Sequence, residues 1–138
     1  MKLGVAEILE KVSKLKSEEE KIALLRANNT VALQTILKGA FDPGIIWELP
    51  EGVPPYKPND LVDQQHRFYA ECRKMYLFIK GGHNNLTPLK RERLYIELLE
   101  SIDPADANLL IAIKDKKMPY TGITLKLINK AIPGLIPT

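Results

Sequence analysis

Apolar residues recur every three to four positions along most of the chain, and this period predicts α-helices rather than strands. Residues 3–15 carry the first such pattern and predict an amphipathic helix. Ser17 followed by Glu20 forms a capping box, in which a hydroxyl and a carboxylate each bind a free amide of a helix's first turn. We therefore expect a second helix to start directly after Ser17.

A third helix is expected next, because Asn29 and Thr30 both have side chains that can accept hydrogen bonds from free helix amides. The apolar positions that follow keep the helical period as far as Leu37. Either Gly39 or the turn at 42–44 ends this helix. Three short helices in succession favour a small bundle.

The segment 42–60, which we call the strap, contains five prolines in 19 residues. Because proline fixes φ and lacks an amide donor, neither a long helix nor a central strand is expected there. The strap also carries too many apolar side chains for a disordered linker. We expect it to be ordered and packed across the bundle, with Trp47 plugging the core rather than stacking on a ligand.

The helical period resumes at Leu61 and predicts a helix that ends at Gly81-Gly82. Its expected apolar stripe consists of Phe68, Cys72, Met75, Tyr76 and Ile79. Thr87-Pro88 and Asp103-Pro104 each combine a capping residue with proline at the first helical position, which predicts two further helix starts. Thr124 is suited to cap a last helix. The fold class is therefore all-α: one helical bundle over residues 1–138, with about six to seven helices and the strap.

The composition excludes several classes of protein. The chain has 138 residues, 15.6 kDa and 45% apolar residues, which is enough for one domain with a modest core. No apolar run reaches the roughly 18 residues that cross a bilayer, and no signal peptide is apparent. The single cysteine, Cys72, forms no internal disulfide and reads as a small buried apolar residue. We expect a cytoplasmic protein that does not bind membranes.

Catalytic chemistry is not apparent in the sequence. His66 falls within a helical stretch and His83 in a loop, and neither lies beside a nucleophile or an orienting partner. No glycine-rich phosphate loop is present, and one cysteine with two histidines makes a zinc site improbable. We expect no enzyme, cofactor or metal. An enzyme with a site assembled from His66, Tyr69 and Glu71 is the least favoured alternative.

Positive charge concentrates near the carboxyl terminus. The net charge is +3, and residues 114–130 contain five lysines against one aspartate. A turn then leads into the helix that Thr124 opens, and a helix start can hold a phosphate on its free amides. The candidate phosphate-binding residues here are Lys114, Lys116, Lys117, Thr121, Gly122, Ile123, Thr124 and Lys126. An ordinary turn with solvated lysines is the alternative reading.

A second basic group follows Thr87-Pro88. Lys90, Arg91 and Arg93 are candidates for a further phosphate contact, assisted by Asn84 and Asn85 from the preceding loop. Arg91 and Arg93 do not share a helix face, so we expect at most part of this group to touch DNA together. Helix solubility is the competing explanation.

The order of the carboxy-terminal motifs resembles a known family. Residues 91–94, then 111–118, then Gly122-Ile123-Thr124 and the ending Ile132-Pro133-Gly134-Leu135-Ile136-Pro137 are similar to the end of the amino-terminal DNA-binding domain of ATP-dependent DNA ligases of the T-even phage type. The opening helices, including Ser17-Glu18-Glu19-Glu20, also resemble that domain. The likeness covers most of the chain and is weakest across the strap.

The resemblance implies a helical domain that grips double-stranded or nicked DNA through its phosphates. Lys114-Asp115-Lys116-Lys117 does not match the Lys-x-Asp-Gly adenylation motif of these enzymes, so ligation by this chain alone is not expected. We therefore expect a non-catalytic, phage-encoded accessory protein of DNA replication or repair, acting in the host cytoplasm. The alternative is a protein-interaction module that has lost DNA binding and contacts a sliding clamp, polymerase or host protein, docking through Trp47 or Tyr56 if these are exposed.

Overall fold

Helices make up most of the computed structural model, which describes residues 3–83 and 85–136. They are α1 (Val5–Lys14), α2 (Glu18–Ala27), α3 (Val31–Phe41), α4 (Arg67–Glu71), the 3-10 helix η1 (Cys72–Phe78), α5 (Pro88–Ser101), α6 (Pro104–Lys114) and α7 (Leu125–Ala131). The described ranges contain no sheet. The all-α prediction is confirmed.

Five helices begin where the sequence predicts a cap. The side chains of Ser17, Thr30, Thr87, Asp103 and Thr124 each accept a hydrogen bond from a backbone amide two or three residues later. Each bond satisfies one of the amides that a helix leaves free in its first turn. Local side-chain chemistry therefore defines these five starts.

Gly39 does not end α3, which continues to Phe41. The turn at 42–44 ends it, where an Asp42 carboxylate oxygen accepts a hydrogen bond from the Gly44 amide at 2.8 Å. Gly39 instead makes room for Trp47, since a Cβ there would lie 2.6 Å from Cζ2 of the indole. The glycine is thus required by packing between α3 and the strap.

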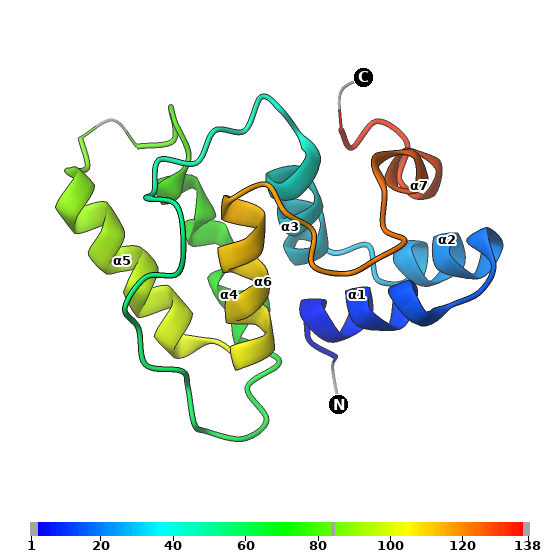
Figure 1. The fold of residues 1–138 in the computed structure, drawn as a ribbon, viewed down its shortest axis with the longest axis horizontal. Coiled ribbons are helices and arrows are strands. Elements are labelled where there is room, and N and C mark those ends of the chain that lie inside the picture. Colours follow the sequence, from blue (N-terminus) through cyan, green and yellow to red (C-terminus); the bar gives the residue numbers. More distant parts are fainter. Residues whose placement is uncertain (1–2, 84, 137–138) are drawn as a thin grey trace.

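The helices spread along the long axis of the molecule (Figure 1). α1, α2 and α7 lie at one end and α5 lies at the other, with α4 behind α6 in this view. α3 and α6 stand between the two ends, where α6 contacts α1 and α5, and α3 contacts α6, α4 and η1. Helices that are far apart in sequence therefore meet. α2 packs on α7, although about a hundred residues separate the two helices along the chain.

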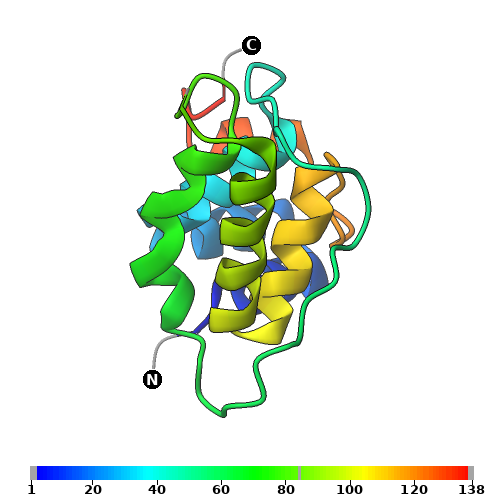
Figure 2. The ribbon, with the colours of Figure 1, turned by 90° about the vertical axis from the view of Figure 1, so that its left-hand side faces the viewer.

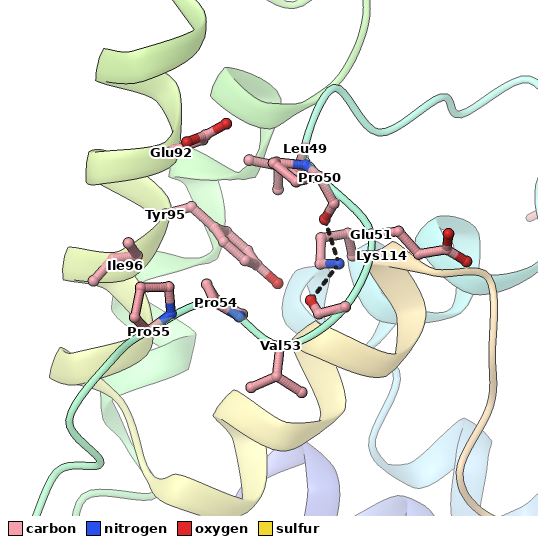
Figure 3. A pocket seen from close by; sticks show the side chains of 11 residues that line it. Leu49, Pro50, Glu51, Val53, Pro54, Pro55, Glu92, Tyr95, Ile96 and Lys114 are labelled. Carbon is pink, nitrogen blue, oxygen red and sulfur yellow. Dashed lines mark hydrogen bonds between the residues drawn. The ribbon is translucent and has the colours of Figure 1, made fainter.

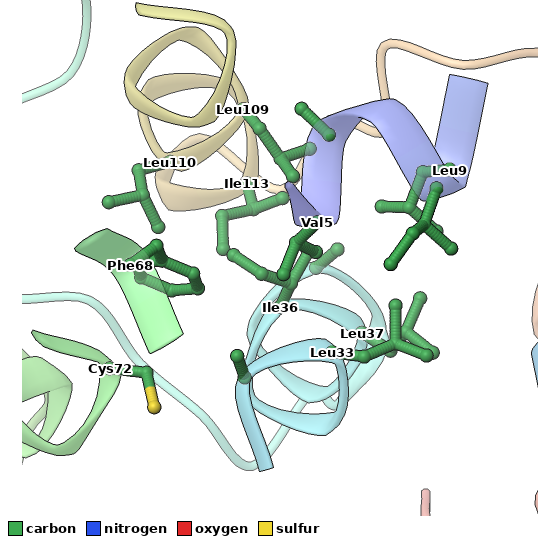
Figure 4. Close-up of a cluster of buried hydrophobic side chains, with 14 of the residues drawn as sticks. Val5, Leu9, Leu33, Ile36, Leu37, Phe68, Cys72, Leu109, Leu110 and Ile113 are labelled. Atoms are coloured by element: carbon green, nitrogen blue, oxygen red, sulfur yellow. The ribbon is translucent and has the colours of Figure 1, made fainter. Parts of the chain in front are cut away.

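The core is built where α1, α3, α4 and α6 converge (Figure 4). Val5, Leu9, Ile36, Phe68 and Leu109 are each no more than 1% exposed. Burial of each such side chain contributes about 1.5–3 kcal/mol relative to leaving it in water. Cys72 is also buried in this cluster, as the sequence predicts, and burial raises the pKa of its thiol.

The strap runs along the outer side of α6 and crosses toward α5 (Figures 1 and 2). The Trp47 ring packs against the core, and its indole Nε1 donates a hydrogen bond to the Gly39 carbonyl at 3.0 Å. Tyr56 donates through its hydroxyl to Asn108 at 3.3 Å, and the Lys57 amide donates to a Glu100 carboxylate oxygen at 2.7 Å. Trp47 thus packs against the core as a partly buried side chain, and the strap packs across the bundle.

The helix predicted from Leu61 to its end at Gly81-Gly82 is wrong in extent and in type. Residues 61–66 are irregular, and only a five-residue α-helix precedes η1. In a 3-10 helix side chains repeat every three residues, so Cys72, Met75 and Phe78 face the core while Tyr76 is 52% exposed. Ile79 is extended and bridges to Trp47 of the strap, which explains why the α-helical period fails here.

Candidate nucleic-acid interface

Lys114, the first lysine of the basic run, is buried. It is therefore not available as the phosphate contact that the sequence predicts. Its side chain is only 2% exposed, because the strap covers it. The ammonium donates to the carbonyls of Pro50 and Gly52 at 2.9 and 3.0 Å and to an Asp115 carboxylate oxygen at 2.8 Å (Figure 3). All three N–H donors of the ammonium are thus in use, and Lys114 holds the strap instead of a ligand.

Lys116 is engaged in a similar way, although part of its side chain is exposed. Its ammonium donates to the carbonyls of Gly39 and Asp42, each at 2.9 Å, and so ties the end of α3 to the segment after α6. Partial burial lowers the pKa of Lys116, and the nearby Asp42 carboxylate opposes that shift. Of the predicted run, Lys117 remains exposed and forms no ion pair within the described part of the chain.

The second basic group is divided by the fold. Arg91 is only 8% exposed and donates to the Leu86 carbonyl at 2.9 Å, so its side chain is enclosed and engaged within the protein rather than displayed as the predicted phosphate contact. Lys90, Arg93 and Asn85 are exposed. Asn84 lies outside the described residues. α5 and α7 stand at opposite ends of the molecule (Figure 1), so this group does not join the carboxy-terminal candidates.

The residues of the turn before α7 differ in their exposure to solvent. Thr121, Gly122 and Thr124 are exposed, but the Ile123 side chain is 5% exposed and belongs to the core. Only the backbone of Ile123 is therefore available to a ligand. Gly122 has φ +78°, a left-handed conformation that glycine adopts without strain. The Thr124 hydroxyl accepts the Leu127 amide at 3.2 Å, so it caps the helix.

This turn forms one wall of a hollow of about 260 Å³ between α2 and α7, which we call the α2–α7 hollow. The residues that line it are Lys16, Glu18, Lys21, Gly122, Thr124, Lys126 and Leu127. The Lys21 ammonium approaches the Gly122 carbonyl at 3.5 Å. No ion pair involves Lys16, Lys21 or Lys126 among the described residues, so three cationic groups face one open depression.

Glu18 is the one acidic side chain among the described residues that line the α2–α7 hollow. Its carboxylate is paired with the Lys130 ammonium at 2.6 Å. The hydrogen bond from Lys130 and the charges of Lys130, Lys126 and Lys21 lower the pKa of Glu18. The charge of Lys130 therefore offsets the charge of Glu18. The lysines that line the hollow then give the hollow an excess of positive charge.

Lys16 and Lys21 were not among the residues that the sequence predicts for phosphate binding. They lie about a hundred positions before Gly122 and reach it only because α2 packs on α7. One signal was available: Lys21 stands four residues before Leu25, which is fully buried, so Lys21 falls at the edge of the packed face of α2. The sequence does not show which helix that face contacts.

Other chemistry is sparse in the described ranges. His66 and His83 are exposed, and no three His, Cys, Asp or Glu side chains come close enough to hold a metal ion in those ranges. None of the helices described is long and apolar enough to cross a membrane.

Comparison with known protein families gives a match over most of the chain. A family model described as a family of unknown function, DUF6433, matches residues 8–120. That range holds α2 and both engaged lysines but ends just before Gly122. No curated protein matches the sequence. The family description names no activity, so the resemblance to ligase DNA-binding domains stays a prediction.

Proposed function

We propose that this chain, which belongs to the DUF6433 family, is a non-catalytic phage protein that binds duplex or nicked DNA through backbone phosphates in the host cytoplasm. The observation that carries the proposal is the α2–α7 hollow, where Lys16, Lys21 and Lys126 surround an open depression and form no ion pair within the described part of the chain. Cations that neutralise phosphates supply binding with little dependence on base sequence.

The position of the hollow adds support. Gly122 and Thr124, which match the phosphate-gripping turn of the resembled ligase domain, line the same hollow as the three lysines. α7 has only seven residues and its cap is already bonded, so we assign the attraction to the lysines rather than to the helix end. The Thr124 hydroxyl proton is free to donate to a phosphate oxygen while its oxygen caps the helix.

The alternative function, a protein-interaction module, expects Trp47 or Tyr56 to form a docking surface. Both side chains are partly buried, and both direct their polar atoms to partners within the chain. This arrangement favours DNA over a sliding clamp or polymerase as the partner. A clamp that binds the protein through another surface would be detected by titrating labelled protein with the purified clamp.

The test of DNA binding is fluorescence anisotropy of a labelled duplex, nicked or intact, at several salt concentrations. We expect a micromolar dissociation constant and a steep fall of affinity with salt, because non-specific binding is typically about 10⁻⁴ to 10⁻⁶ M. Replacing Lys16, Lys21 and Lys126 together by Gln should reduce the log–log salt slope by up to about 2.7, since each phosphate contact contributes about 0.9.

A matched control removes the same charge elsewhere. Lys38, Lys57 and Lys80 also form no ion pair among the described residues, and none of them lines the α2–α7 hollow. Replacing these three by Gln should leave most of the affinity and slope in place. Equal losses in the two triple variants would mean that only net charge matters and would contradict the assignment to the hollow.

A further inference from the structure

A second pocket, of about 270 Å³, lies between the strap and α5, far from the α2–α7 hollow (Figures 1 and 3). Its lining is mainly apolar and includes Leu49, Val53, Pro54, Pro55 and Ile96. The strap is held over it by the Lys114 ammonium and by a hydrogen bond from the Gly52 amide to Asp115 at 3.2 Å. The pocket is therefore built from a fixed loop and a rigid helix.

The hydroxyl of Tyr95 points into this pocket and has no hydrogen-bond partner among the residues that the structure describes (Figure 3). The Tyr95 side chain is 2% exposed, and its ring is held edge-on against Phe78 with the ring centroids 5.2 Å apart. A buried hydroxyl without a partner is unfavourable, because it has given up its bonds to water. A ligand that supplies a partner would remove that penalty.

The charges around the pocket restrict the kind of ligand. All three donors of the Lys114 ammonium are already bonded, so it offers nothing to an anion. Glu92, which is partly exposed, and Glu51, which is exposed, both add negative charge to the lining and disfavour anions further. A cavity of about 150 Å³ accommodates benzene, so about 270 Å³ has room for a molecule of two fused rings.

We propose that this pocket binds a neutral bicyclic heteroaromatic compound whose inner ring nitrogen accepts a hydrogen bond from the Tyr95 hydroxyl. The strap prolines and Ile96 cover the faces of the rings, and Glu92 accepts from a donor on the outer edge. The site is independent of the α2–α7 hollow, so it stands whether or not the protein binds DNA.

Benzimidazole is a suitable probe, because it is neutral at pH 7.5 and carries one nitrogen acceptor and one N–H donor. We would titrate it into ¹⁵N-labelled full-length protein and follow backbone amide shifts by NMR. Saturable shifts should centre on the strap around Val53 and on α5 around Tyr95 and Ile96. Shifts spread over the surface, or no saturation up to the solubility limit, would overturn the proposal.

Two variants test the role of the hydroxyl. Tyr95→Phe should weaken benzimidazole binding by about twofold to tenfold, the usual range for one neutral hydrogen bond. Tyr76→Phe removes a hydroxyl from an exposed tyrosine outside the pocket and should change nothing. Unchanged affinity in Tyr95→Phe would overturn the proposal. Ile96→Trp, on the partly exposed face of α5, should fill the pocket and abolish the shifts while the amide spectrum stays dispersed.

Discussion

The strap side of the molecule and the α2–α7 hollow both contain lysines, but the two regions use the charge differently. Under the strap, Lys114 is surrounded by carbonyls and Asp115, and its ammonium has no donor left. At the hollow, Lys16 and Lys126 are exposed and have no ion pair among the described residues. A lysine's availability to a ligand therefore depends on what the fold packs against it, and clustering in sequence is a poor guide.

The largest loss of stability is expected from a variant that removes the contacts of Lys114 with the strap. Lys114→Met leaves the Pro50 and Gly52 carbonyls and the Asp115 carboxylate without their donor, and removing one partner of a buried ion pair costs about 3–5 kcal/mol. Urea unfolding followed by circular dichroism measures the loss. Lys117→Met, at an exposed position, should change the free energy of unfolding by no more than about 0.5 kcal/mol. Similar values for the two variants would show that Lys114 is not a structural lysine.

The second effect on stability is expected at Asp106, a buried carboxylate of α6. One oxygen of Asp106 accepts a hydrogen bond from the Ala6 amide at 2.9 Å, which ties α6 to the start of α1, and the other has no partner in the described ranges. Burial raises the pKa of Asp106 to about 7, against the opposing hydrogen bond from Ala6 and with smaller contributions from Asp103 and Glu7.

Because the folded-state pKa of Asp106 lies above the unfolded value, its contribution to stability is complete below about pH 4 and is lost as the pH rises to about 7. In that window the wild type should lose stability relative to Asp106→Asn by at most about 1.4 kcal/mol per pH unit. Urea unfolding at pH 4.5, 6 and 8 tests this. Parallel pH curves for the two proteins would contradict a raised pKa.

A third variant acts on the packing beneath the strap. Gly39→Ala places a methyl group against the Trp47 indole and should destabilise the fold by about 1–3 kcal/mol, as overpacking usually does. Trp47→Phe removes the contacting ring atoms, so the effects of the two substitutions should not add. Additive losses in the double variant would show that the glycine is needed for another reason. DNA affinity should stay unchanged in folded Gly39→Ala.

The smallest effect is expected on duplex affinity, from a change in the lining of the α2–α7 hollow. Glu18→Gln removes the carboxylate from the lining and frees Lys130, so duplex affinity should rise, by up to about fivefold, in 0.1 M salt. Glu19→Gln changes an exposed neighbour that does not line the hollow and serves as the control. Anisotropy titrations compare them. An equal rise in both variants would indicate a general charge effect.

Helix starts were predictable because their causes are local. A serine, threonine or aspartate side chain bonds an amide two or three residues away, so Ser17, Thr87 and Asp103 reveal their helices without any knowledge of the fold. The 61–79 region was not predictable in the same way. There the apolar positions fit an α-helix as well as a 3-10 helix. The structure has the 3-10 helix, and it is followed by a bridge between Ile79 and the distant Trp47.

The site was predictable only in part, for a related reason. Gly122 and Thr124 belong to a local turn-and-cap pattern and line the hollow, but Lys114 and Lys116 bond carbonyls more than 60 residues earlier in the chain. Long-range packing also brings Lys21 to Gly122. Residue types and charge runs therefore identify candidates, while tertiary contacts decide which of them stay free.

The central claim is that DNA contacts the α2–α7 hollow rather than the basic run after α6 or the start of α5. The most direct measurement is backbone amide NMR of the labelled protein titrated with a short unlabelled duplex. We expect the largest shifts at Lys16, Lys21, Gly122, Thr124 and Lys126. Shifts confined to α5 around Lys90 and Arg93, or the absence of shifts in low salt, would contradict the claim.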